Sequence, residues 1–172
     1  GGFHSGTNRF NDVWYFNVVA MEWTQPTPPQ SEFTPRGNHL PSRAMQPGVP
    51  SPRGAHSATL IDKKVWIFGG YGGLGYSRRD FDDLYTWDTE EMSWDKVKTK
   101  GAAPEKRSAH TACAVVTEHL KQLFVFGGWN SMTQFSDMHI LDTRTLQWSN
   151  VPGEGLCLDG EPRWNMSACA VV

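Results

Sequence analysis

The chain has 172 residues, a formal net charge of −2, and 38% hydrophobic and 12% aromatic residues, which fits a globular unit of ordinary size. It has no run of 18 apolar residues, and Lys and Arg are interspersed with Asp and Glu. We therefore expect neither a membrane-spanning helix nor a binding site for nucleic acid or an anionic membrane. Three Cys without a CxxC spacing disfavour a disulfide framework or a zinc site and favour a reducing compartment.

The first segment, residues 1–23, opens on Gly1-Gly2 and then carries an apolar run that extends from Asp12 to Trp23. Short apolar runs rich in Val, Ile and aromatic residues, bounded by Gly, Pro, Asn and Asp, predict β-strands. We expect two strands after Asp12, forming the second half of a four-stranded unit. Val18-Val19 stand where the later copies of this run have Asp-Thr, so the turn between these strands departs from the pattern.

The second segment, residues 24–52, holds eight of the eleven Pro of the chain. Proline cannot continue a β-ladder and favours extended conformations, as in Pro26-Thr27-Pro28-Pro29. We interpret this segment as an insertion between two repeated units. It is either a passive loop or an insert that docks a partner.

Residues 53–100 carry every part of one complete unit. Arg53 to His56 precedes an apolar run, a second run ends in Gly69-Gly70, a third follows Asp83, and a fourth starts at Trp94. The Gly pair supplies backbone freedom where the chain leaves a strand, and the Trp fills the wedge between neighbouring sheets. Lysines alternate along the predicted fourth strand, where they oppose edge-to-edge aggregation: Lys96, Lys98 and Lys100.

Residues 107–152 repeat the same parts in the same order, and a further copy begins at residue 163. Arg107 to His110 matches Arg53 to His56, and Gly127-Gly128 and Trp148 follow at the corresponding places. In the last copy Arg163 is followed by Met166 at the His position, and the tail predicts the first strand of another unit over residues 163–172. Such self-similarity indicates a repeat architecture in which each unit buries its faces against its neighbours.

These motifs together resemble the kelch repeat: Arg-x-x-His-Ser/Thr, an apolar run into Phe-Gly-Gly, then Asp-x-x-x-x-Asp-Thr and a Trp. Asp83 to Thr89 and Asp137 to Thr143 are two examples. The resemblance implies an all-β fold, a kelch-type β-propeller built of four-stranded antiparallel blades around a channel. Propellers have roughly four to eight blades, so we expect this chain to be about three blades of a propeller of roughly six or seven, with the remaining blades as its neighbours.

One face of the predicted propeller differs between the copies. The loops between the second and third strands emerge there, together with the connections between blades, whereas the other face carries short hairpins of similar kind. Long, dissimilar loops on a repeated scaffold are where recognition usually lies, although such loops can also be idle. The candidate partner-binding residues on this face are of the types that anchor interfaces: Arg9, Tyr71, Tyr76, Arg78, Arg79, Trp129, Asn130 and Gln134.

The Arg and His at the start of each blade have two interpretations. Arg53 with His56 and Arg107 with His110 resemble a catalytic or metal-binding set, but they recur at each blade entrance. We therefore interpret them as structural hydrogen-bonding pairs. The residues that define the repeat are Gly1, Gly2, Trp23, Arg53, His56, Gly69, Gly70, Trp94, Arg107, His110, Gly127, Gly128, Trp148 and Arg163.

The sequence contains none of the catalytic motifs considered next. No nucleophile can be assigned a base and an orienting group, and neither phosphate-loop spacing nor His-Glu-x-x-His occurs. Kelch-like copper and iron enzymes exist, but the six His are scattered and no Glu-x-x-x-Asp-x-x-x-His run is present. We expect no catalytic residue, no metal site and no cofactor, while a site on further blades stays open.

The functional hypothesis is a non-enzymatic scaffold or adaptor that binds a partner protein through its loop face. Two more specific roles stay open, a substrate-recognition subunit of a ubiquitin ligase and a cytoskeletal or ciliary scaffold. The expected location is the cytoplasm, with association with the cytoskeleton or cilium left open, because no secretory leader is visible at the N-terminus.

Overall fold

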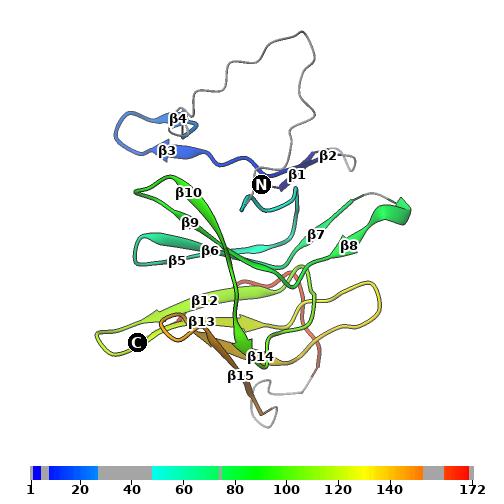
Figure 1. Ribbon diagram of the computed structural model, residues 1–172. Coiled ribbons are helices and arrows are strands. Elements are labelled where there is room, and N and C mark those ends of the chain that lie inside the picture. Colours follow the sequence, from blue (N-terminus) through cyan, green and yellow to red (C-terminus); the bar gives the residue numbers. More distant parts are fainter. Residues whose placement is uncertain (1, 5–7, 27–47, 74, 153–160, 171–172) are drawn as a thin grey trace.

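The computed structural model describes residues 2–4, 8–26, 48–73, 75–152 and 161–170. The described chain is built of β-strands, with a single 3₁₀ turn, η1 (Gly75–Ser77). Its sheets stack one after another in chain order, with the first hairpins at the top of Figure 1 and the last complete sheet at the bottom. The prediction of an all-β fold made of antiparallel blades is confirmed.

Two sheets have the complete order of four strands. Blade I consists of β5 (Ser57–Ile61), β6 (Lys64–Phe68), β9 (Leu84–Asp88) and β10 (Ser93–Val97), paired antiparallel in the order β10-β9-β6-β5. Blade II consists of β12 (Thr111–Val116), β13 (Lys121–Phe126), β14 (Met138–Asp142) and β15 (Gln147–Val151). Neighbouring strands in sequence therefore pair throughout each blade.

The first unit consists of two separate hairpins. β1 (Gly2–His4) pairs with β2 (Asn8–Phe10), and β3 (Tyr15–Asn17) pairs with β4 (Glu22–Thr24). The turn between β3 and β4 has the same form as in the blades, because Asn17 accepts hydrogen bonds from the amides of Val19 and Ala20 at 2.9 Å each. Asp88 and Asp142 make the same pair of bonds in the blades.

We predicted that the first copy of this turn departs from the pattern, but its backbone hydrogen bonds are the same as in the other copies. Asn17, rather than Val18, takes the Asp position, and Val18 takes the place of Thr89 and Thr143. Those Thr hydroxyls donate to the carbonyls of Lys63 and Lys121 in the neighbouring hairpin of their own blade, a bond that valine cannot make.

The core lies between the two blades. Trp66, Phe68 and Leu84 of blade I face Leu123, Leu141 and Trp148 of blade II, and the ring centroids of Phe68 and Trp148 lie 5.7 Å apart. The second strands are nearly continuous in apolar residues because both of their faces are covered.

The three repeated Trp residues differ in burial. Trp148 is 2% exposed because it packs on the face of blade I, whereas Trp23 is 65% exposed. Trp94 is half-buried; it packs on Trp87 and lines an open groove of about 370 Å³ between blade I and the first unit. The wedge-filling role expected for these residues therefore depends on the sheet that precedes each one.

Two expectations about strands are wrong. β10 ends at Val97, and Lys100 does not continue it: β11 (Lys100–Gly101) pairs parallel with β15 of the next blade. Residues 163–170 form no strand. Residues 171–172, Gly1 and most of the proline-rich segment, residues 27–47, lie outside the described residues.

Candidate functional site

The blades are joined by a hydrogen-bond pattern that repeats at every junction. The second Gly of each pair donates its amide to the carbonyl of the Arg that opens the next unit: Gly2 to Arg53 at 3.0 Å, Gly70 to Arg107 at 2.8 Å and Gly128 to Arg163 at 2.7 Å. The same three Arg amides donate in turn to the carbonyls of Phe10, Phe81 and Phe135. Residues 163–165 are thus held in the junction position although they form no strand.

Close approach of backbones explains why these positions are glycine. A Cβ on Gly128 would lie 2.7 Å from Cβ of His110 and 2.8 Å from the carbonyl oxygen of Ser108. Gly70 has the corresponding contacts with His56 and Gly54, and both glycines have a positive φ, 91° and 87°. Any other residue would strain the backbone and separate the strands at the entrance of the blade.

The Arg at each blade entrance pairs with an Asp and not with the neighbouring His. Arg53 donates to both carboxylate oxygens of Asp83 at 2.5 and 3.2 Å, and Arg107 donates to those of Asp137 at 2.5 and 2.9 Å. The guanidinium of Arg107 also covers the ring of Phe135, 4.1 Å from its centroid. The expected hydrogen-bonding pairs of Arg with His are therefore wrong, because the arginine donors are used by the Asp and by backbone carbonyls.

Of the two His residues, His110 lies buried between the sheets, and His56 is half-buried beside the groove between blade I and the first unit. Nε2 of His110 lies 2.9 Å from the hydroxyl of Ser57 of the preceding blade, and Nδ1 of His56 and of His110 has no hydrogen-bond partner. Burial, assisted by Arg53, lowers the pKa of His56 to about 4. Burial, assisted by Arg107, lowers the pKa of His110 to about 3, so both rings are neutral at pH 7.

The loops of the two blades meet on one side of the molecule, which we call the loop face. It comprises residues 71–82 of blade I, with β7 (Tyr71–Gly72), η1 and β8 (Arg79–Asp80), and residues 129–136 of blade II. In Figure 1 these loops project to the right, whereas the β5–β6, β9–β10 and β12–β13 turns project to the left. The loops therefore emerge on the side opposite the short hairpins.

Three of the predicted binding residues come together on the loop face. The guanidinium of Arg78 lies between two aromatic rings, 4.2 Å from the centroid of Tyr71 and 4.8 Å from that of Trp129. The Arg78 side chain is 29% exposed, so one of its edges stays accessible. A cation held between rings of two blades gives the loop face a fixed aromatic and cationic centre.

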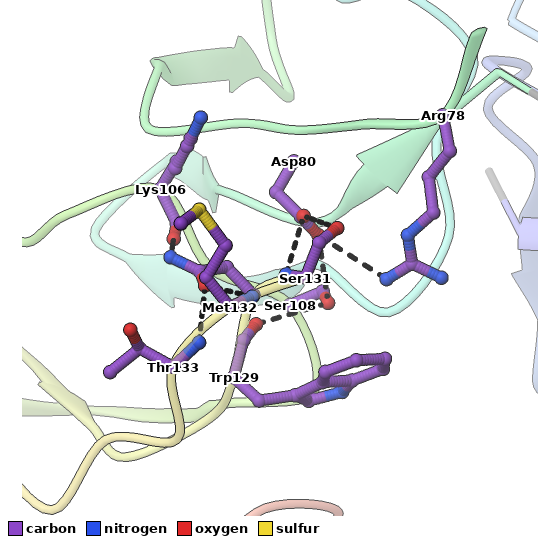
Figure 2. Close-up of polar contacts among 9 residues, drawn as sticks. Arg78, Asp80, Lys106, Ser108, Trp129, Ser131, Met132 and Thr133 are labelled. Carbon is purple, nitrogen blue, oxygen red and sulfur yellow. Dashed lines mark hydrogen bonds and ion pairs between the residues drawn. The ribbon is translucent and has the colours of Figure 1, made fainter. Parts of the chain in front are cut away.

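Asp80, which the sequence did not single out, holds this centre in place. Its side chain is only 3% exposed, and its carboxylate accepts bonds from the hydroxyl of Ser108 at 3.2 Å and from the amide and hydroxyl of Ser131 at 3.3 and 3.1 Å. Arg78 lies 3.5 Å from the same carboxylate (Figure 2). Asp80 thus connects the loop of blade I to the entrance and the loop of blade II.

Asn130 is not an exposed anchor as expected. It is buried, its carboxamide oxygen accepts from the amides of Met132 and Thr133 at 2.9 and 2.8 Å, and its nitrogen donates to the carbonyl of Lys106 at 3.3 Å. Asn130 therefore shapes the turn that carries Met132. The sequence did contain a signal for this role, because Asn is a common first residue of such turns.

Of the other predicted binding residues, Gln134 pairs with Trp129 of this centre in an isolated β-bridge. Tyr76, in η1, is fully exposed, and Arg79 and Gln134 are exposed. The guanidinium of Arg79 lies over the Phe81 ring, 5.3 Å from its centroid. The backbone of Arg9 lies in β2, and nothing is described of its side chain. Met132 is 91% exposed on the tip of its loop, a contribution that sequence reasoning missed.

The described residues offer no group of three or more His, Cys, Asp or Glu side chains arranged to hold a metal ion. Cys113 lies in β12 and Cys169 is exposed, while Cys157 lies outside the described residues. In the described part of the chain, no helix has the length and apolar character needed to cross a membrane.

Comparison with known proteins identifies relatives along the whole chain. The family model for the KLHDC2/KLHL20/DRC7 Kelch-repeats domain matches residues 1–172. Kelch domain-containing protein 3 of Homo sapiens is 33% identical over 175 residues, which cover 95% of this chain and 39% of that protein. The chain thus spans about two fifths of the length of these relatives.

Two further relatives cover the chain to different extents. Acyl-CoA-binding domain-containing protein 4 of Arabidopsis thaliana is 38% identical over 106 residues, which cover 62% of this chain and 15% of that protein. The dynein alpha chain of the flagellar outer arm of Chlamydomonas reinhardtii is 26% identical over 148 residues, which cover 83% of this chain and 3% of that protein.

Proposed function

This chain belongs to the kelch-repeat family, and we propose that it acts as a non-enzymatic scaffold or adaptor that binds a partner protein through its loop face. Kelch repeats are in general protein–protein interaction modules. The observation that supports the loop face as the binding surface is the stack of Tyr71, Arg78 and Trp129 across two blades, fixed by the buried carboxylate of Asp80.

The fixed centre favours binding because ordered loops lose little conformational entropy when a partner docks. Tyr76 and Met132 are exposed on the two loops that form the loop face, and the exposed Arg79 adds a donor. Tyr, Met and Arg are enriched at protein interfaces. The hairpins of the other face instead carry exposed ion pairs such as Lys63 with Glu90, which are well solvated.

Two narrower roles fall within this proposal. One is a substrate-recognition subunit of a ubiquitin ligase, and the other is a cytoskeletal or ciliary scaffold. The similarity to a flagellar dynein chain favours the second role, over a stretch that is 3% of that protein. A cytoplasmic location belongs to the same proposal.

The proposal is tested by affinity capture from cell lysate with the full-length protein. Tyr76, Arg79 and Gln134 are changed together to Ala, because their exposed side chains leave the buried network of Asp80 intact. The matched control changes Lys63, Glu90 and Arg144 on the opposite face. We expect the first variant alone to lose a defined partner, whose affinity for each purified variant is then measured by calorimetry. Retention of the partner by the first variant and its loss by the control would place binding on the opposite face.

A further inference from the structure

His139 lies in β14, 6% exposed, with each ring nitrogen next to an oxygen atom. Nδ1 lies 2.9 Å from the carbonyl oxygen of Ala102, and Nε2 lies 2.9 Å from Oδ2 of Asp137. The ring also meets the indole of Trp148 edge to face, with centroids 6.5 Å apart. The imidazole is therefore held on two sides by polar contacts and on a third by an aromatic ring.

Both oxygen neighbours of His139 can only accept hydrogen bonds. A backbone carbonyl has no proton to donate, and a carboxylate has none while it is ionised. Burial raises the pKa of Asp137, but hydrogen bonds from Arg107 and His139 outweigh it and hold that pKa well below its usual range. Both contacts are hydrogen bonds only when both nitrogens of His139 carry protons.

The carbonyl of Ala102 belongs to the linker between the blades, residues 98–106. In this linker β11 adds a parallel fifth strand to the outer edge of blade II, where the amides of Lys100 and Ala102 donate to the carbonyls of Leu146 and Trp148 at 3.0 and 3.2 Å. The Nδ1 atom of His139 provides a side-chain contact from β14 to this linker.

Blade I provides an internal comparison. The residue that corresponds to His139, two positions after the paired Asp, is Tyr85, which is packed near the guanidinium of Arg53. Among the described residues, the sheet of blade I has four paired strands, and Gly48 of the preceding segment lies beside β10, where an added Cβ would be 3.0 Å from the carbonyl oxygen of Trp94. Blade I therefore has tyrosine at the position where the blade with the paired parallel strand has histidine.

We propose that His139 is a proton-dependent latch that fastens the linker to the outer edge of blade II. With both nitrogens protonated, the imidazole bonds Asp137 and the carbonyl of Ala102 together. Loss of one proton leaves a lone pair facing an oxygen in one of the two contacts, and that contact becomes repulsive. Because Asp137 keeps its bonds to Arg107, the linker is the part that is free to detach, which uncovers the backbone edge of β15.

Two charged side chains lie next to the imidazole of His139 or reach it through one neighbour. Asp137 contacts the imidazole, and Arg107 reaches it through Asp137. The strands on either side, β13 and β15, place the neutral residues Val125 and Asn150 opposite His139. The linker itself carries exposed charged residues: Lys98, Lys100, Glu105 and Lys106.

The latch is tested by hydrogen exchange of the linker amides in the full-length protein at about pH 5.5 and about pH 8.5. After correction for the intrinsic exchange rate, we expect the Lys100 and Ala102 amides to be protected about tenfold more at the lower pH, because a bond from a charged donor is gained there. Global destabilisation by acid acts in the opposite direction and is thereby distinguished.

Two variants and a control complete the test. His139→Tyr introduces the residue of blade I, and His139→Gln removes titration; both should leave the linker weakly protected at either pH. His119→Gln, an exposed histidine on the hairpin face, should behave as the unmodified protein. Linker protection that does not change with pH, or a response that persists in His139→Gln, would overturn the proposal. If both variants fail to fold, ¹⁵N shifts of His139 decide: a singly protonated ring with a protected linker would overturn it.

Discussion

Arg107 donates to both carboxylate oxygens of Asp137 from a guanidinium that is completely buried. One blade earlier, Arg53 and Asp83 make the same pair at the same separation of 30 residues. Each pair ties the entrance of a blade to the start of its third strand. A buried guanidinium requires a counter-ion, because burial removes the hydration of its charge.

Removal of one partner should therefore be costly. We expect Asp137→Asn to lower the free energy of unfolding by about 3–5 kcal/mol, because the Arg107 charge stays buried without its counter-ion. The matched control is Glu90→Gln, which breaks the exposed pair of Lys63 and Glu90 and should cost less than about 1 kcal/mol. Chemical denaturation of the full-length variants measures both values, and equal losses would contradict the structural role of the buried pair.

Stability should fall as the solution is acidified below pH 7. The folded pKa values of His56 and His110, about 4 and about 3, lie below the ordinary histidine value of 6.5. The unfolded chain therefore binds more protons than the native state as the pH falls from 6.5. The free energy of unfolding decreases progressively toward pH 4 for this reason. Asp137, whose pKa is also lowered in the folded state, adds a loss below the unfolded carboxyl value of about 3.9. Denaturation midpoints between pH 7.5 and 4.5 test this dependence, and His110→Gln should flatten it.

Substitution of the junction glycines separates crowding from backbone strain. Gly128→Ala should destabilise the protein by about 1–3 kcal/mol, because its Cβ would overlap Ser108 and His110. Gly2→Ala serves as control: its φ is also positive, 123°, but no atom lies within 4 Å of the added carbon. A smaller shift of the melting temperature in the control is expected, and equal shifts would mean that close approach of the blades does not select glycine.

The carboxylate of Asp80 should matter for the order of the loop face. Asp80→Asn is expected to cost about 1–2 kcal/mol and to raise hydrogen exchange over residues 129–134, because the bonds to Ser108 and Ser131 lose their charged acceptor. Asp82→Asn, two residues away and exposed, should change stability by less than about 0.5 kcal/mol. If exchange in residues 129–134 is the same in both variants, Asp80 does not hold the two loops together.

The repeated parts of the fold were predictable because they recur in order. Positive φ at Gly70 and Gly128, the apolar second strands and the alternation of hairpins all follow from residues that the copies share. The pairing of Arg107 with Asp137 was missed because adjacency in sequence favoured His110 as its partner. The signal was present, since both Asp residues follow their Arg at a constant separation.

Features without a repeated counterpart were not predictable in the same way. β11 contains Lys100 and Gly101, which have no strand pattern, and its position is set by the free edge of β15. Asp80 stands among several charged loop residues, and only the folded structure separates its buried carboxylate from the exposed Asp82. Tertiary contacts between blades decide these positions.

Site-specific photo-crosslinking in cells shows whether the partner binds on the loop face. A photoreactive amino acid replaces Tyr76 on the loop face or, in a matched protein, Glu90 on the hairpin face; both side chains are exposed. We predict a covalent adduct with a discrete partner protein from position 76 and none from position 90. An adduct formed from position 90 and absent from position 76 would contradict the account.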